Sequence, residues 1–251
     1  MPDFRAYVAA TTAEAAEIRL TPEESHHLVT VNRCGRGDPV TAFDGRGREW
    51  FTECTDPSKG AAVLRVKESR QAKPLPYEIT LSQAVPKGST MDDIIRQATE
   101  VGAARIVPLL SERTQVHLDG DRADKKVEKW RTTAIEAAKQ CGNPWLPEIA
   151  PIQDFTSFLA TAKDYDLRLV ASLHAGPTTL KKALATYTAK HGHPPRSALW
   201  LVGPEGDFSA AEMTAAVMAG FVPVTLGPLV LRSATAAIYA LSILSHELQG
   251  G

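Results

Sequence analysis

Three segments in the C-terminal half combine glycine and polar side chains directly after apolar runs. They are ASLHAGP at 171–177, VGPEGD at 202–207 and TLGPLVLRSAT at 225–235. Glycine lets a backbone approach a ligand closely, and exposed N–H groups in such turns hold polar ligand edges. We therefore predict that the three turns meet at one ligand-binding pocket. The alternative is that their glycines are plain turn residues.

The sequence lacks the common motifs for nucleotide binding and for metal binding. Neither GxxxxGK[ST] nor GxGxxG occurs, which argues against binding a nucleoside triphosphate or a dinucleotide in the usual ways. The cysteines Cys34, Cys54 and Cys141 show no CxxC pairing and no metal-like spacing with histidine. We therefore expect reduced thiols in a cytoplasmic protein and no metal site.

Alternating strands and helices must position the three turns. Apolar runs predict strands at 78–85, 105–110, 167–173, 198–203 and 222–227. Amphipathic periodicity and capping signals predict helices at 91–102, 123–142, 178–190, 209–219 and 234–249, the helix at 209 beginning with a Ser209–Glu212 capping box. The fold class is therefore α/β, with a mostly parallel sheet covered by helices on both faces and ligands beyond the carboxyl ends of its strands.

The N-terminal part has a different pattern and indicates a small β-barrel. Two extended runs in PVTAFDGRGREWFTEC, 39–54, flank a turn at 44–47 and predict a hairpin, and 61–68 alternates like a strand. A proline-containing linker is expected at 69–78, so we place the domains at 1–72 and 73–251. Residues 1–20 lack the apolar core of a signal peptide, and no run is long enough to span a bilayer.

The two C-terminal turns carry a resemblance. VGPEGDFSAAE, followed by GFVPVTLGPLVLRSATAAIYAL, resembles the C-terminal signature of the ribosomal RNA small-subunit methyltransferase E family, which belongs to the SPOUT class. Segments that fit the same family are Ser111-Glu112-Arg113, KKVEKWRTTAIEAAKQCG at 125–142, Pro-Glu-Ile at 147–149, His27, Arg33 and FDGRG at 43–47. The match covers nearly the whole chain.

The resemblance implies a fold and an activity. It implies a C-terminal SPOUT domain with a deep trefoil knot, an N-terminal PUA-like barrel that helps to hold RNA, and a homodimer. It implies transfer of a methyl group from S-adenosylmethionine to N3 of one uridine in small-subunit ribosomal RNA, either free or in the assembled 30S subunit. The alternatives are a related SPOUT enzyme with another target nucleotide and a non-catalytic RNA-binding relative.

The resemblance also implies which residues line the cofactor site and which act on the RNA. The cofactor residues are Leu173, His174, Val202, Gly203, Pro204, Glu205, Gly206, Leu226, Gly227, Leu231 and Thr235. Arg232 is the candidate catalytic cation, because charge develops on the carbonyl oxygens of uracil as the N3 proton leaves. The alternative for Arg232 is a carboxylate partner in the knot. No general base is assigned.

RNA contacts would require local basic patches, because the formal net charge is only −1. The candidates are Arg33, Arg36, Arg46, Lys87, Arg113, Lys125, Lys126 and Lys129. For the lysines of 122–131 the alternative is a solvated helix face. The chain departs from the family pattern at Gln97, Asn143, Asp207, Leu229 and Ala234.

The final helix suggests self-association. Apolar residues in SATAAIYALSILSHELQ cover more of the helix circumference than one core-facing stripe requires. We therefore expect a two-fold homodimer that buries this helix, the alternative being burial within its own domain.

Overall fold

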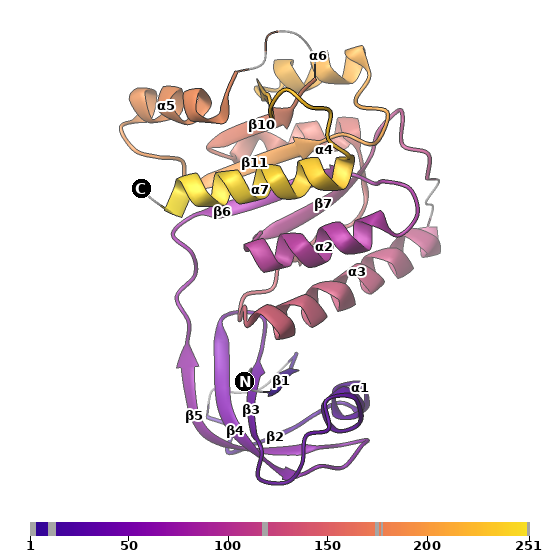
Figure 1. Ribbon diagram of the computed structural model, residues 1–251, viewed down its shortest axis with the longest axis vertical. Helices are drawn as coiled ribbons and strands as arrows, with labels where there is room; N and C mark the ends of the chain where they lie inside the picture. The colour runs from indigo at the N-terminus through magenta and orange to yellow at the C-terminus, as the bar shows by residue number, and fades with distance from the viewer. Residues whose placement is uncertain (1–3, 10–13, 117–119, 174–175, 177, 250–251) are drawn as a thin grey trace. The chain divides into compact units, whose positions relative to one another are not determined.

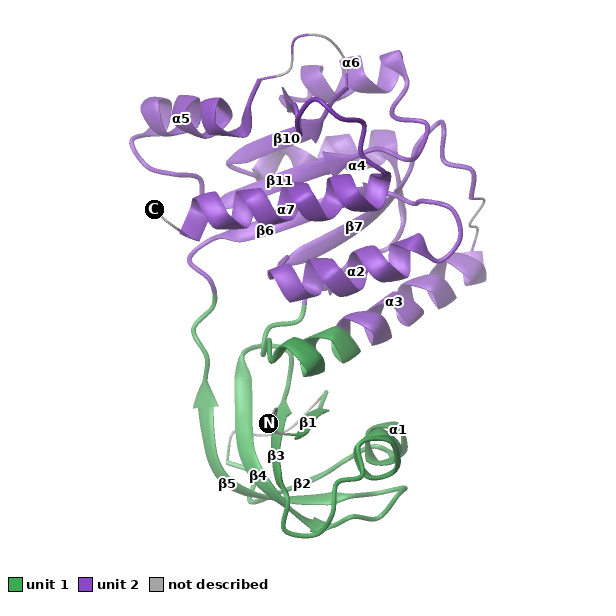
Figure 2. Ribbon diagram, in the orientation of Figure 1, with its two compact units in different colours: residues 1–74, 135–146 green, residues 75–134, 147–251 purple. Residues whose placement is uncertain are grey.

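The structure, a computed structural model, describes residues 4–9, 14–116, 120–173, 176 and 178–249. The chain forms two compact units (Figure 2). Unit 1 contains residues 1–74 and 135–146, and unit 2 contains 75–134 and 147–251. One helix, α3 (Gly120–Cys141), therefore contributes its last residues to unit 1.

Unit 1 is built on a five-stranded sheet with the order β1-β3-β4-β5-β2. Its strands are β1 (Phe4–Tyr7), β2 (Glu17–Arg19), β3 (Pro39–Phe43), β4 (Arg48–Asp56) and β5 (Val63–Gln71). A short helix, α1 (Pro22–His26), runs into a π-helical turn, η1 (His27–Val31). The core of this unit contains fully buried Trp50, Cys54 and Leu64.

The predicted hairpin is confirmed as the antiparallel pair β3 and β4. Its turn needs glycine, because Gly45 and Gly47 both have positive φ, in the left-handed region that other residues rarely enter. The segment after α3 packs on this turn, where Gly47 N donates to Pro144 O (3.0 Å) and Leu146 N donates to Gly45 O (2.9 Å). These bonds explain why 135–146 belong to unit 1.

Unit 2 contains a seven-stranded sheet in which every pairing is parallel. The strands are β6 (Glu78–Ala84), β7 (Arg105–Leu110), β8 (Glu148–Ile149), β9 (Gln153–Asp154), β10 (Leu167–Ala171), β11 (Ser197–Val202) and β12 (Val222–Val224). Their order is β12-β10-β11-β6-β7-β8, and β9 also pairs with β7. The predicted α/β class with a mostly parallel sheet is confirmed.

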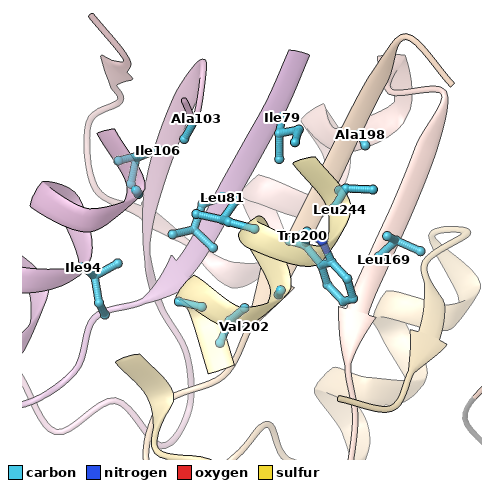
Figure 3. Close-up of a cluster of buried hydrophobic side chains, with 14 of the residues drawn as sticks. Ile79, Leu81, Ile94, Ala103, Ile106, Leu169, Ala198, Trp200, Val202 and Leu244 are labelled. Carbon is cyan, nitrogen blue, oxygen red and sulfur yellow. The ribbon is translucent and has the colours of Figure 1, made fainter. Parts of the chain in front are cut away.

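Helices cover both faces of this sheet (Figure 1). One face carries α2 (Thr90–Val101), the first part of α3, α5 (Leu180–His191) and α7 (Ser233–Gln249) over a core that includes Leu81, Trp200 and Leu244 (Figure 3). The other face carries α4 (Phe155–Thr161) and α6 (Ala210–Met218). Helix α4 is followed by a 3-10 turn, η2 (Ala162–Asp164). Phe155, Phe208 and Leu201 lie in this second core.

Several sequence expectations are wrong at their edges. The linker is shorter than 69–78, because 69–71 extend β5. The strands predicted to reach 173 and 227 end at Ala171 and Val224. Cys141, near the end of the predicted helix 123–142, is exposed, whereas Lys139 near it is buried and ion-paired to Glu24 at 2.6 Å. The trefoil knot stays a prediction.

Candidate functional site

The carboxyl ends of β10, β11 and β12 surround one cavity of about 740 Å³. The prediction that three glycine-bearing turns meet at one pocket is therefore confirmed. The lining residues are Thr90, 171–173, 202–205, Asp207, 226–227 and 229–236. Every one of these segments belongs to unit 2.

Most of the predicted cofactor residues line this cavity. They are Leu173, Val202, Gly203, Pro204, Glu205, Leu226, Gly227, Leu231 and Thr235, together with Arg232. Gly206 was also predicted, but it is not among the described residues that line the cavity. A Cβ built on Gly206 would instead contact the Arg113 side chain, at 3.4 and 3.5 Å. His174 lies outside the described residues. Its predicted role stays a prediction.

The loop that follows β11, residues 203–207, is tied to two neighbouring loops by polar contacts. Glu205 accepts a hydrogen bond from the backbone N of Lys87, 3.1 Å away. Arg113 donates through Nη1 to the Gly206 carbonyl oxygen at 2.7 Å. Glu205 therefore orients the loop, whereas Ser209 and Glu212 cap α6 in the predicted capping box. The same Glu212 also accepts from the backbone N of Glu112 at 2.8 Å.

Left-handed backbone occurs at one unexpected position of this loop. Asp207 has positive φ, in a region that glycine enters freely and that Asp tolerates better than most residues. The Asp207 carboxylate accepts a hydrogen bond from the backbone N of Phe208 at 2.8 Å, which supports the turn. The departure from the family pattern at 207 is therefore compatible with the loop conformation.

The loop after β12 lines the cavity with Leu226 and Gly227. Gly227 also has positive φ, and a Cβ built on it would have no neighbour among the described atoms within 4 Å. Its glycine therefore serves the backbone conformation rather than a crowded contact. Thr225 stabilises the turn, because its hydroxyl lies 3.1 Å from both the N and the O of Gly227.

Arg232 is exposed at the edge of the cavity, just before α7. Within the part of the chain that the structure describes, it forms no ion pair with a carboxylate. The predicted alternative, a carboxylate partner in the knot, is therefore absent from those residues. The cation is available to an anionic or polar substrate group.

Sequence reasoning did not name several residues of the cavity as site residues. Leu229 and Val230, within the predicted turn at 225–235, are 72% and 78% exposed. Together with the predicted Leu173, which is 59% exposed, they place apolar side chains around the cavity. Leu229 was visible in the sequence only as a departure from the family pattern. Thr90 and Ser233 gave no signal, because single hydroxyl residues at helix starts are common.

The three α3 lysines that were predicted to bind RNA differ in their surroundings. Lys129 is bound to the Asp92 carboxylate of α2, and the ammonium of Lys126 lies 6.0 Å from the centre of the Trp130 ring. Lys125 is exposed and pairs with no carboxylate among the residues described. Lys125 is therefore the lysine of this set with the freest charge.

The arginines of unit 1 that were predicted to bind RNA do not all lie together. Arg36 precedes β3, and Arg46 lies in the turn after it, so the two arginines lie toward opposite ends of that strand. Both are exposed, as is Arg33, which has left-handed backbone with positive φ. An RNA contact through these residues would require an extended strand of RNA rather than a single phosphate.

Two of the three cysteines are buried together in unit 1. Burial and the neighbouring Cys54 raise the pKa of the Cys34 thiol to about 12. Burial likewise raises the pKa of Cys54, whereas Cys141 is exposed. Among the described residues, no group of three or more His, Cys, Asp or Glu side chains is placed to hold a metal ion.

The final helix buries most of its apolar side chains within its own unit. Ala237, Leu241 and Leu244 belong to the core. The exposed positions of α7 are mainly polar, namely Thr235, Tyr239, Ser242, His246 and Gln249. The sequence argument for a dimer, excess apolar surface on α7, is therefore not supported by this burial pattern, and the homodimer stays a prediction.

None of the helices in the described ranges has the length and apolar character needed to cross a membrane.

Comparison with known proteins defines the class to which this fold and cavity belong. Residues 73–245 match the family described as RNA methyltransferase domain, and residues 20–67 match the family described as RNA methyltransferase PUA domain. The first match covers the whole cavity. The chain is thus built as an RNA methyltransferase with a PUA domain.

Curated relatives narrow the class to one family. A ribosomal RNA small subunit methyltransferase E from Synechocystis is 33% identical, with 98% of this chain and 78% of that protein covered. One from Bacillus subtilis is 32% identical, with coverages of 94% and 92%. The chain belongs to the ribosomal RNA small subunit methyltransferase E family.

Solved structures agree with this assignment. A Legionella pneumophila protein solved with bound cofactor SAM is 30% identical, with a TM-score of 0.89 over 98% of both chains. A ribosomal RNA small subunit methyltransferase E from Neisseria gonorrhoeae, bound to S-adenosyl methionine, is 27% identical, with a TM-score of 0.86 over 98% of both chains.

Proposed function

We propose that this enzyme transfers the methyl group of S-adenosylmethionine to N3 of one uridine in small-subunit ribosomal RNA. The observation that carries the proposal is the cavity of about 740 Å³ at three strand ends, with Arg232 at its edge. Family membership and the two relatives solved with the same cofactor support it.

The residues of the cavity fit S-adenosylmethionine. The volume falls within the range of about 300–1,000 Å³ that small-molecule sites have. Apolar side chains such as Leu226 and Leu231 suit the faces of adenine, and Gly227 leaves open space beside its backbone for a ligand. When bound, the sulfonium cofactor supplies an activated methyl group.

The remaining task of the protein is to orient the uridine and to stabilise its charge. Loss of the N3 proton places negative charge on the flanking carbonyl oxygens, and a cation at the edge of the cavity stabilises that charge. Arg232 is suited to this role because it is exposed there and has no carboxylate partner among the described residues. Alignment of the reacting atoms is the other large contribution.

The RNA is held by local basic residues rather than by net charge. We assign the holding of RNA to residues 1–72 and methyl transfer to residues 73–251. Lys87 and Lys125 are exposed in unit 2, and the backbone contact of Lys87 leaves its ammonium available. In this proposal the substrate is free rRNA or the 30S subunit, and the enzyme is a cytoplasmic homodimer.

Methylation of defined RNA tests the proposal. Small-subunit rRNA and 30S particles from a strain lacking this enzyme are incubated with the purified full chain and S-adenosylmethionine. We expect one 3-methyluridine per rRNA, identified by mass mapping against a nucleoside standard, and much slower formation of the same product with the R232A variant. Methylation of another base or another atom would refute the N3-uridine assignment. Cofactor binding without any RNA product would favour the non-catalytic relative.

A further inference from the structure

The side-chain amide of Gln83 is buried next to residues that line the cavity. Gln83 is 0% exposed near the end of β6, where it is in register with Val202, the last residue of β11. The chain leaves the sheet at Gly203 immediately afterwards. Gln83 itself is not among the described residues that line the cavity.

The Gln83 amide joins two segments that do line the cavity. Its Nε2 donates to Ser233 Oγ at 2.9 Å and to the Gly203 carbonyl oxygen at 3.4 Å. Ser233 Oγ in turn donates to the same Gly203 carbonyl at 2.8 Å. The three groups form a closed triangle, which we call the Gln83 triangle. It links the end of β6, the loop after β11 and the first residue of α7.

The triangle fixes a spacing that bears on cofactor binding. Gly203 begins the loop 203–207, and Ser233 directly follows the loop 226–232, and these two loops face the same cavity. Backbone hydrogen bonds of the sheet cannot fix this spacing, because both residues lie outside β11 and β12. The direct Ser233–Gly203 bond therefore holds the loops together, with Gln83 orienting the hydroxyl.

The buried Gln83 amide also lowers the stability of the fold, because one of its polar atoms lacks a hydrogen-bond partner among the residues described. The remaining Nε2 contact of Gln83 is the carbonyl of Ala84 at 2.8 Å, so the donors are used, but Oε1 is buried with no partner among the described groups. A buried acceptor without a partner destabilises a fold, whereas an apolar side chain of similar size would not. Stability alone therefore does not explain an amide here.

We propose that Gln83 and Ser233 are positioning residues for methyl transfer, which set the spacing of loops 203–207 and 226–232 around the cofactor. The inference rests on the proposed use of this cavity for S-adenosylmethionine. Neither residue needs to touch a reacting atom. Their effect passes through the Gly203 carbonyl and the start of α7.

The sharpest test uses the Ser233 hydroxyl, because its removal creates little empty space. S233A should weaken S-adenosylmethionine binding, measured by calorimetry, by about two- to tenfold, the range expected for one net hydrogen bond. S233T keeps a hydroxyl and should restore affinity to within about twofold of the parent. Q83L should weaken binding by a similar factor, and adding S233A to Q83L should have less than the summed effect, since both act in one triangle.

The matched control is S245A. Ser245 is another buried hydroxyl of α7, 3.1 Å from the Tyr77 hydroxyl, and it lies toward the opposite end of the helix from Ser233. S245A should lower the melting temperature but leave cofactor affinity unchanged. If S233A binds cofactor as tightly as the parent, or if S245A weakens binding equally, the positioning role is overturned.

Hydrogen exchange separates this inference from the proposed function. In the free full-length protein, S233A should speed amide exchange in peptides covering 203–207 more than S245A does. Unchanged exchange there would overturn the coupling of the loops, whether or not the parent binds S-adenosylmethionine. A parent protein with normal coupling but no cofactor binding would instead refute the proposed function and the role in methyl transfer.

Discussion

Two glycines of the loop after β11 should respond very differently to the same added methyl group. A Cβ on Gly203 would lie 3.2 Å from Asp207 Oδ1 and 3.4 Å from both Asp207 Cα and Phe208 Cδ2. A Cβ on Gly206 would meet only the Arg113 side chain, at 3.4 and 3.5 Å. G203A is therefore the perturbation, and G206A is its matched control.

The neighbours of Gly203 have little freedom to move. Asp207 is fixed by its left-handed backbone and by its hydrogen bond to Phe208 N, and Phe208 is only 1% exposed. Overpacking of such a site costs about 1–3 kcal/mol. In a domain of this size that cost lowers the melting temperature by about 2–12 °C. The new methyl group of G206A would make only ordinary van der Waals contact with the exposed Arg113 side chain, so the bond from Arg113 to the Gly206 carbonyl can stay in place. That variant should stay within about 0.5 kcal/mol of the parent.

Cofactor binding should follow the same order, since Gly203 lines the cavity and Gly206 does not appear among its described lining residues. If about 1.4 kcal/mol of the strain at Gly203 opposes binding, S-adenosylmethionine affinity falls tenfold. Thermal unfolding and calorimetry on both variants measure the two effects. Equal losses in G203A and G206A, or a larger loss in G206A, would refute the reasoning from these contacts.

Three further predictions concern charge and protonation. R232A should raise the activation free energy of methyl transfer by about 2–4 kcal/mol, which slows turnover of cofactor-saturated enzyme, with little change in S-adenosylmethionine affinity. Weaker cofactor binding with unchanged turnover would contradict a role in stabilising the developing charge. K125Q should reduce the slope of log RNA affinity against log salt by about 0.7–0.9. K129Q, whose charge already pairs with Asp92, should change it less, and equal slopes for both variants would contradict this ranking. The pKa of Cys34 is about 12 in the folded protein against an ordinary value of 9.0, so the stability from its buried neutral thiol is complete below about pH 9 and is lost as pH rises toward 12. C34A should flatten that alkaline decline in denaturant unfolding, and an unchanged decline would assign it to other groups.

The parallel sheet and its helices were predictable because their signals are local. The apolar run 105–110 coincides with β7, the run 198–203 overlaps β11 with a one-residue difference at each end, and the Ser209–Glu212 capping box marks the start of α6. Shorter elements were missed where the local signal is weak. Helix α4 begins at Phe155 with an Asp154 cap, but its seven residues give too little periodicity to distinguish it from a loop.

The pocket was predictable from sequence, but its internal contacts were not. Glycine after an apolar run indicates a turn at a strand end, and parallel strands bring such ends to one edge. Which side chain crosses between turns depends on residues far apart along the chain. Lys87 and Glu205 are separated by 118 positions, and Arg113 and Gly206 by 93. No local pattern encodes such a pairing.

These distant contacts change the meaning of the predicted RNA-binding residues. Arg113 was expected to face RNA, but its guanidinium holds the Gly206 carbonyl at 2.7 Å. Lys87 was expected there too, and its backbone N also donates to Glu205, which leaves the predicted role of its ammonium untested. We therefore predict that displacing Arg113 shifts the loop after β11 and, with it, Gly203 at the cavity. RNA that takes the Arg113 guanidinium would compete with its bond to the Gly206 carbonyl, and we expect such RNA to lower the affinity for S-adenosylmethionine measured by calorimetry.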